Sequence, residues 1–216
     1  VLSSRGAIVL DRSLYGPQLD LTATVRDLDL NTNPETVEII TVTVSTAGGD
    51  LETMVLTETA ADTSIFNGMI TLEDNAVTTG NGILEISHSE TITAVYIDAD
   101  DGYGGTNVEV TDTARTDCVG PVISGVRVSV VSDWEMTVSW ETDEEADTQL
   151  FYGEIDPDQT AKVDGLSLHH QLKVNDLNPC TEYVFFVASK DAAGNPVSYT
   201  HLRAHETVLD LVCRLL

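Results

Sequence analysis

Two short acidic segments, 27–33 and 98–102, contain the residues of this chain that are best suited to binding a ligand. Each follows a stretch in which apolar and polar residues alternate, so each is expected to leave the end of a β-strand. If both strands end at the same pole of a sandwich, their trailing loops bring up to six oxygen-bearing side chains together. The side chains in question are Asp27, Asp29, Asn31, Asp98, Asp100 and Asp101.

Calcium is the ligand that this supply of oxygen atoms suits, because Ca²⁺ takes about six to eight oxygen ligands in a flexible cage. The sequence therefore predicts calcium as the cofactor. The alternative is a pair of solvated acidic turns, since Asp and Asn also favour turns for local hydrogen-bonding reasons. The first segment resembles the start of an EF-hand loop, but Pro34 and the missing Gly-x5-Glu continuation exclude that motif.

Residue patterns typical of catalysis are absent from the sequence. It contains no Gly-x-Ser-x-Gly, no His-Glu-x-x-His and no phosphate-binding glycine loop before a helix. His88 lies in an expected turn, and His169 and His170 are neighbours on an expected strand, where they face opposite ways and do not readily share a metal. We therefore expect a non-enzymatic protein.

The net charge of the chain limits the classes of partner that it is expected to bind. With 36 Asp and Glu against 10 Lys and Arg, the 216 residues carry a formal charge of -26, yet 42% of them are hydrophobic, enough to bury a core. We expect the acidic side chains to lie on the surface. Such a surface repels phosphate backbones and anionic lipids, so nucleic acid is excluded as a default partner, and no apolar stretch approaches the roughly 18 residues of a membrane span.

The elements that must hold these residues are strands. Period-2 alternation recurs about every ten residues and helix periodicity is nearly absent, which predicts an all-β chain. The expected strands of residues 1–114 are enough for one immunoglobulin-sized sandwich. They cover 7–10, 18–26, 37–45, 51–57, 66–72, 83–86, 92–97 and 107–111. A linker over 115–120 follows, where Gly120-Pro121 interrupts any sheet ladder.

Several motifs follow the linker: 121–124, then 136–144 (MTVSWETDE) and 146–153 (ADTQLFYG), then 177–183 (LNPCTEY), 185–188 (FFVA) and 191–195 (DAAGN). With them, the segment from 121 to 196 resembles a fibronectin type III module of the type found in secreted bacterial proteins and at the head of purple acid phosphatases. The resemblance implies that the Trp140 ring lies in the core between the sheets. It also implies that Tyr183 is the corner tyrosine, whose hydroxyl bonds back to the backbone near Leu177.

The first 114 residues contain the motifs LDRSLY from Leu10, DLDLN from Asp27, LTET from Leu56, FNG from Phe66 and YIDAD from Tyr96. Through these motifs, residues from about 6 to 114 have a looser resemblance to an immunoglobulin-like or cadherin-like repeat of large bacterial surface and secreted proteins. The fold class predicted for the chain is thus two tandem immunoglobulin-like β-sandwiches.

The last twenty positions, 197–216, differ in character. Back-translated in one frame, Val197 to Thr207 resembles a transposase sequencing adapter, and Leu211 to Leu216 resembles the primer that follows it. We therefore expect a non-native tail, which leaves the second module without its native last strand. The pair His201 and His205, spaced as a zinc pair on a helix would be, is discounted for the same reason.

Two cysteines, Cys118 and Cys180, remain outside the tail, and whether they pair is left open, because strand topology places them at opposite poles of the second module. Val1 is neither an initiator Met nor part of a leader, which suggests a fragment.

We expect an extracellular or cell-surface pair of spacer, adhesion or interaction modules in a larger secreted protein. Its partners would be the other domains of that chain and a protein or glycan left unidentified. One alternative is an accessory region of a secreted hydrolase or peptidase whose catalytic domain lies elsewhere. A weaker one is a carbohydrate-binding module.

Overall fold

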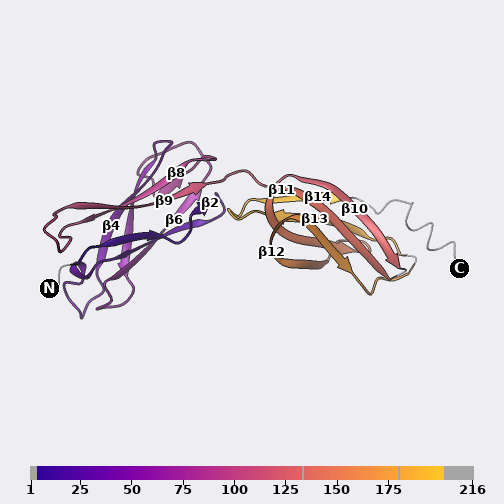
Figure 1. Ribbon diagram of the computed structural model, residues 1–216, viewed down its shortest axis with the longest axis horizontal. Helices are drawn as coiled ribbons and strands as arrows, with labels where there is room; N and C mark the ends of the chain where they lie inside the picture. The colour runs from indigo at the N-terminus through magenta and orange to yellow at the C-terminus, as the bar shows by residue number, and fades with distance from the viewer. Residues whose placement is uncertain (1–3, 133, 180, 202–216) are drawn as a thin grey trace. The chain divides into compact units, whose positions relative to one another are not determined.

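The chain forms two separate β units, divided between Val119 and Gly120 (Figure 1). The computed structural model describes residues 4–132, 134–179 and 181–201. Within these ranges every regular element is a strand except one 3-10 turn, η1 (Leu28–Leu30), and no helix is long and apolar enough to cross a membrane. The predicted all-β class is confirmed. The boundary lies inside the segment predicted as a linker, although the last strand of the first unit extends to Thr116.

Nine strands build the first unit. They are β1 (Ala7–Leu10), β2 (Leu14–Tyr15), β3 (Asp20–Arg26), β4 (Ile39–Thr46), β5 (Leu51–Glu58), β6 (Ile65–Glu73), β7 (Ile83–Glu85), β8 (Thr91–Asp98) and β9 (Val108–Thr116). Along most of them buried and exposed side chains alternate, as the period-2 pattern predicts.

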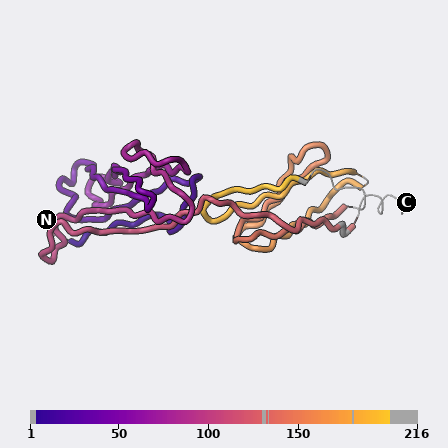
Figure 2. Tube along the Cα trace, turned by 90° about the horizontal axis from the view of Figure 1, so that it is seen from above, coloured from indigo at the N-terminus to yellow at the C-terminus, as the bar shows by residue number. Residues whose placement is uncertain are grey.

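Pairing in the first unit follows the order β1-β3-β6-β5-β4-β8-β9-β2, with β7 beside β6. From β3 to β8 the path takes four successive antiparallel steps, so β3 and β8 run in the same direction and end at the same pole. Figure 2 shows the backbone running back and forth between loops that gather at the ends of each unit. This topology is what brings the loop after β3 to the loop after β8.

The core of the first unit lies between the two halves of this folded sheet. Tyr15, Leu21, Leu56 and Phe66 are among its fully buried side chains. The first strand is also held from the side, because the Asp112 carboxylate of β9 accepts a hydrogen bond from the Leu10 amide at 2.8 Å.

Five strands build the second unit. They are β10 (Ile123–Ser132), β11 (Glu135–Gly153), β12 (Gln159–Val174), β13 (Val184–Lys190) and β14 (Pro196–His201). β11 is long enough to serve both halves of the sheet: its first part pairs with β10 and its second part with β13. β12 pairs antiparallel with β11 on both sides of a register shift, which lies between Glu141 and Ala146 of β11.

Two predictions about the second core are confirmed. Trp140 is 2% exposed and packs with the inward residues of both halves. The Tyr183 hydroxyl accepts a hydrogen bond from the Asn178 amide at 2.9 Å, one residue beyond Leu177, so it forms the expected tyrosine corner.

The first residues of the adapter-like tail occupy a strand position. β14 pairs antiparallel with β13 from Pro196 to His201. Yet none of Val197, Ser198, Tyr199 and Thr200 is buried. The strand thus pairs through its backbone, and these four side chains are not part of the buried core. The remainder of the predicted tail, 202–216, lies outside the described residues.

Candidate metal centre

Three acidic side chains converge at the pole where β3 and β8 end. One carboxylate oxygen each from Asp27, Asp29 and Asp98 lies within 4.8 Å of the other two. Oxygen atoms at this spacing fit around one cation, because Ca²⁺–oxygen distances are about 2.3–2.6 Å and two ligands on one ion are therefore separated by at most about 5 Å. The predicted convergence of the two acidic loops is what the structure shows for these three residues.

Local turn chemistry positions Asp27 and Asp29. Asp27 has extended backbone angles and caps the turn η1, with its Oδ1 accepting a hydrogen bond from the Asp29 amide at 2.9 Å. This cap folds the chain back within two residues, so both carboxylates are presented to the same side. Asp27 continues the buried parity of β3 and is only 3% exposed.

Asp98 is held from two directions. Its Oδ2 accepts a hydrogen bond from the Gly6 amide at 2.7 Å, and its Oδ1 accepts one from the Asp100 amide at 3.1 Å. It continues the inward face of β8 and is fully buried. The segment before β1 is therefore tied directly to the acidic cluster.

Burial makes the charge of Asp27 costly. The pKa of Asp27 is raised above its ordinary value, chiefly because the carboxyl is buried and to a smaller extent because Asp98 and Asp29 lie nearby. Hydrogen bonds oppose this rise, including one donated by the Tyr96 hydroxyl to Asp27 Oδ2 at 2.6 Å. The same environment raises the pKa of Tyr96, first through burial and then through the bond to Asp27.

Sequence reasoning missed two residues that shape this centre, Gly6 and Tyr96. A Cβ atom at Gly6 would lie 2.6 Å from Tyr96 Cε1 and 2.8 Å from Asp27 Oδ2, so this position has room only for glycine. Tyr96 shares the inward parity of Asp98, two positions along β8. That alternation was the signal that an aromatic hydroxyl and a carboxylate face the interior together.

Asn31 is also a predicted ligand, and it lies at the end of η1. Its Nδ2 donates a hydrogen bond to Asp62 Oδ1 at 2.8 Å. Its Oδ1 is buried and has no hydrogen-bond partner among the described residues.

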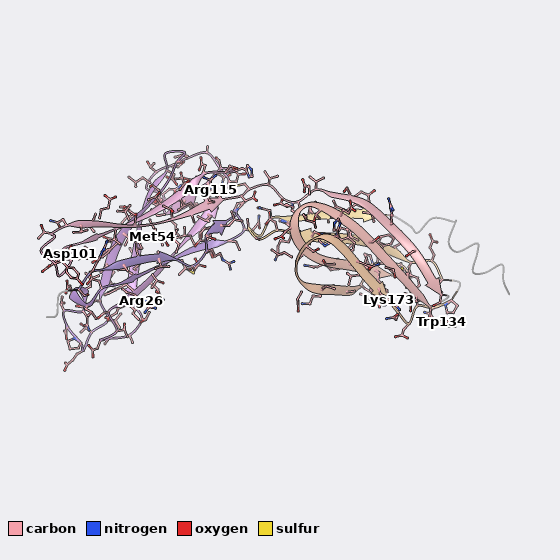
Figure 3. All side chains as sticks on the ribbon, viewed as in Figure 1. Arg26, Met54, Asp101, Arg115, Trp134 and Lys173 are labelled. Carbon is pink, nitrogen blue, oxygen red and sulfur yellow. The ribbon has the colours of Figure 1, made fainter. Side chains whose placement is uncertain are left out.

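The structure does not bring Asp100 and Asp101 into the three-carboxylate group. Asp100 Oδ1 accepts a hydrogen bond from the Gly102 amide at 3.0 Å. Asp101 Oδ1 accepts hydrogen bonds from the amides of Tyr103 and Gly105 at 2.8 and 2.7 Å. Both carboxylates thus stabilise the loop between β8 and β9, in which Figure 3 labels Asp101.

The expectation that the acidic residues lie on the surface is wrong for seven of them. Buried acidic side chains occur at Asp27, Asp50, Glu52, Glu58, Glu85, Asp98 and Asp191. Backbone N–H groups supply the compensation: Glu52, for example, accepts hydrogen bonds from Gly80, Asn81 and Gly82. A carboxylate that receives several amide donors is satisfied inside a protein without a counter-ion.

The histidines are placed largely as predicted. His169 is exposed and 3.6 Å from a carboxylate oxygen of Glu141, whereas its neighbour His170 is buried and faces the core. His88 lies in a turn, where its Nδ1 is 2.9 Å from a carboxylate oxygen of Asp117. His169 and His170 therefore do not converge on one metal.

The cysteine question stays open. Cys118 forms no disulfide within the described residues; it packs against the first core, and burial raises the pKa of its thiol to about 11. Cys180 lies outside the described residues, so the structure does not test its pairing with Cys118.

Comparison with known proteins adds little to the geometry. No protein-family model and no curated protein sequence matches the chain. Among solved structures, it is similar to the chicken CNTN1 FN1–FN3 domains, with TM-score 0.45 and 16% identity over 93% of this chain and 68% of that one.

It is also similar to a two-domain fibronectin type III segment of chicken tenascin, with TM-score 0.33 and 16% identity over 90% and 97% of the two chains. A third similarity is to a segment of titin, with TM-score 0.41 and 14% identity over 92% and 66%. Because these TM-scores lie below 0.5, the fold assignment rests on the strands and cores of this chain.

Proposed function

We propose that the chain consists of calcium-stabilised, non-catalytic modules that act as spacers or interaction surfaces in a longer secreted or cell-surface protein. The convergence of Asp27, Asp29 and Asp98 at one pole of the first unit is the observation that supports the calcium centre most directly. Two units with separate hydrophobic cores support the modular role. The partners would be other domains of the longer chain.

A bound cation would relieve a specific electrostatic cost. Without one, carboxylates that are buried at this spacing repel one another, and each loses hydration. A cation that binds only the folded state adds RT ln(1 + [L]/Kd) to its stability, about 2.7 kcal/mol at a hundredfold excess over Kd. The stabilisation would act on the first unit alone.

The test is thermal unfolding of the chain in EDTA and in millimolar calcium, combined with titration calorimetry. We expect calcium to raise the melting temperature of the first unit, and the double variant Asp27→Asn/Asp98→Asn to lose this gain while still folding. Asp100→Asn/Asp101→Asn is the matched control, since it removes two charges from the same pole outside the cluster. If wild-type protein shows no calcium heat and no shift, the acidic loops are structural turns and the proposal fails.

The pH dependence of the calcium effect follows from the raised pKa of Asp27. A group whose pKa is raised by folding favours the folded state at low pH, and this contribution is lost as pH rises through the folded-state value. Without calcium, the ionised Asp27 therefore destabilises the folded state most at neutral pH, and a bound calcium ion would offset this destabilisation. We expect the gain from calcium to shrink as acid protonates Asp27.

The alternatives differ in what they require of the rest of the protein. An accessory region of a hydrolase or peptidase needs a catalytic domain elsewhere in the same polypeptide, which the full-length sequence would reveal. A carbohydrate-binding module needs a polar or aromatic platform. A hollow of about 300 Å³ on the second unit, over Arg127, Ser139, Glu141 and Gln171, is where binding of a sugar would be sought by glycan array.

A further inference from the structure

We infer that Asp62, on the loop between β5 and β6, is a positioning residue of the calcium centre, which aims the side-chain oxygen of Asn31 at the cation. The inference rests on the proposed calcium site and extends it to a third loop. Two observations on the Asn31 amide group carry it: its NH₂ end is held by Asp62, and its oxygen is buried without a hydrogen-bond partner among the described residues.

The chemistry of the contact fixes which way the Asn31 amide points. A carboxylate presents only acceptors at neutral pH, so the group 2.8 Å from Asp62 Oδ1 must be the NH₂ end of the amide. The flipped amide would place its oxygen against a carboxylate oxygen and lose the hydrogen bond. Asp62 therefore dictates that Oδ1 points away from it.

The missing partner of Asn31 Oδ1 is the second observation that the inference uses. A buried carbonyl oxygen without a donor destabilises the folded state, and proteins rarely leave such a group uncompensated. Asn31 follows Asp27 and Asp29 in the same loop, where η1 turns the chain back on itself. A calcium ion held by the carboxylates would give this oxygen a partner, because amide carbonyls are among its normal ligands.

The backbone conformation of Asp62 helps to shape the loop between β5 and β6. Asp62 has φ 68°, a left-handed conformation that Asp and Asn tolerate and that Gly adopts without strain. Close by, Ser64 O accepts a hydrogen bond from the Asp27 amide at 3.1 Å, so this loop is fastened to the cluster at a second point. Position 62 can therefore be changed to Asn or Gly without disturbing the turn.

These two replacements form a matched pair for the test. Asp62→Asn keeps an oxygen that can accept the hydrogen bond from Asn31, whereas Asp62→Gly removes it, and both remove the same charge. Asn31→Ala removes the oxygen itself. Binding is measured on the full chain with Ca²⁺ by calorimetry and with Tb³⁺ by luminescence excited through Tyr96, whose hydroxyl bonds to Asp27.

We expect Asn31→Ala and Asp62→Gly each to weaken calcium binding by about tenfold, the equivalent of one lost hydrogen bond or ligand. Asp62→Asn should retain near wild-type affinity. In the Asn31→Ala background, Asp62→Gly should have no further effect, because the only role of Asp62 is to orient Asn31.

Three results would overturn the inference. Unchanged affinity in Asn31→Ala would show that Oδ1 is not a ligand. Equal losses in Asp62→Asn and Asp62→Gly, or a further loss in the Asn31→Ala background, would show that Asp62 acts through its charge or by direct binding. Absence of calcium binding to wild-type protein would instead refute the proposed function, and this inference with it.

Discussion

Replacement of Trp140 by Phe tests how the second unit is held together. The Trp140 ring is 2% exposed, stacks on His170 with centroids 5.1 Å apart, and donates a hydrogen bond from Nε1 to Ser189 Oγ at 3.1 Å. Phe keeps an aromatic ring but leaves Ser189, which is 1% exposed, without this donor. Loss of a buried partner costs about 1–3 kcal/mol, and complete removal of a buried Trp or Phe side chain costs about 3–5.

We therefore expect Trp140→Phe to destabilise the second unit by about 2–4 kcal/mol, from the lost hydrogen bond and the smaller ring. In urea this moves the midpoint of the second unit down by roughly 1–2 M at a slope of about 2 kcal/mol/M, the middle of the range for small domains. Circular dichroism follows both transitions, and the first unit is the internal control. The double variant Trp140→Phe/Ser189→Ala should lose less than the sum of the two single variants.

A shift of less than about 0.5 kcal/mol, or a shift of the first transition, would refute the assignment of Trp140 to a separate second core.

Two further predictions concern the same unit and the tail. Burial lowers the pKa of His170, so its contribution to stability is present above the ordinary histidine value and is lost as pH falls towards the folded-state value. Melting of the second unit should therefore drop between about pH 7 and 5 in wild type, and drop less in His170→Gln; equal slopes would contradict this. Deletion of 208–216 should leave the melting temperature of the first unit unchanged, and a large decrease would show that the tail is integral to the fold.

The strand pattern of the first unit was predictable because its chemistry is local. Alternation in Gln18–Arg26 or Leu51–Thr57 follows from one sheet face meeting a core and the other meeting water. The Trp140 and Tyr183 positions came from a family resemblance, and both are confirmed. The pattern did not reveal that β11 is one continuous strand from Glu135 to Gly153. A bend within one strand can take the place of a turn between two strands.

The candidate site was predictable only in part. Alternation indicated that Asp27 and Asp98 end their strands, and topology then placed those ends at one pole. The contributions of Gly6 and Asp62 depend on contacts across 92 and 31 residues of sequence, respectively. Local patterns contain no information about such contacts, so sequence reasoning could not find them.

The distribution of carboxylates in the first unit separates structural acidity from candidate ligand chemistry. Glu58 is buried, and burial opposes its ionisation, yet amide donors from Ser64, Thr63 and Glu38 together lower its pKa. Asp27 receives a single amide donor and a tyrosine hydroxyl, and its pKa is raised. Both residues hold loops, but only Asp27 does so at a net electrostatic cost while two other carboxylates lie within reach of the same point. Buried carboxylates that accept loop amides, such as Glu52 and Glu58, thus account for part of the negative charge. Burial raises the pKa of Asp50 as well, but among the described residues of the first unit only the pole where β3 and β8 end brings three carboxylates within reach of one point, and the calcium experiment therefore tests that pole.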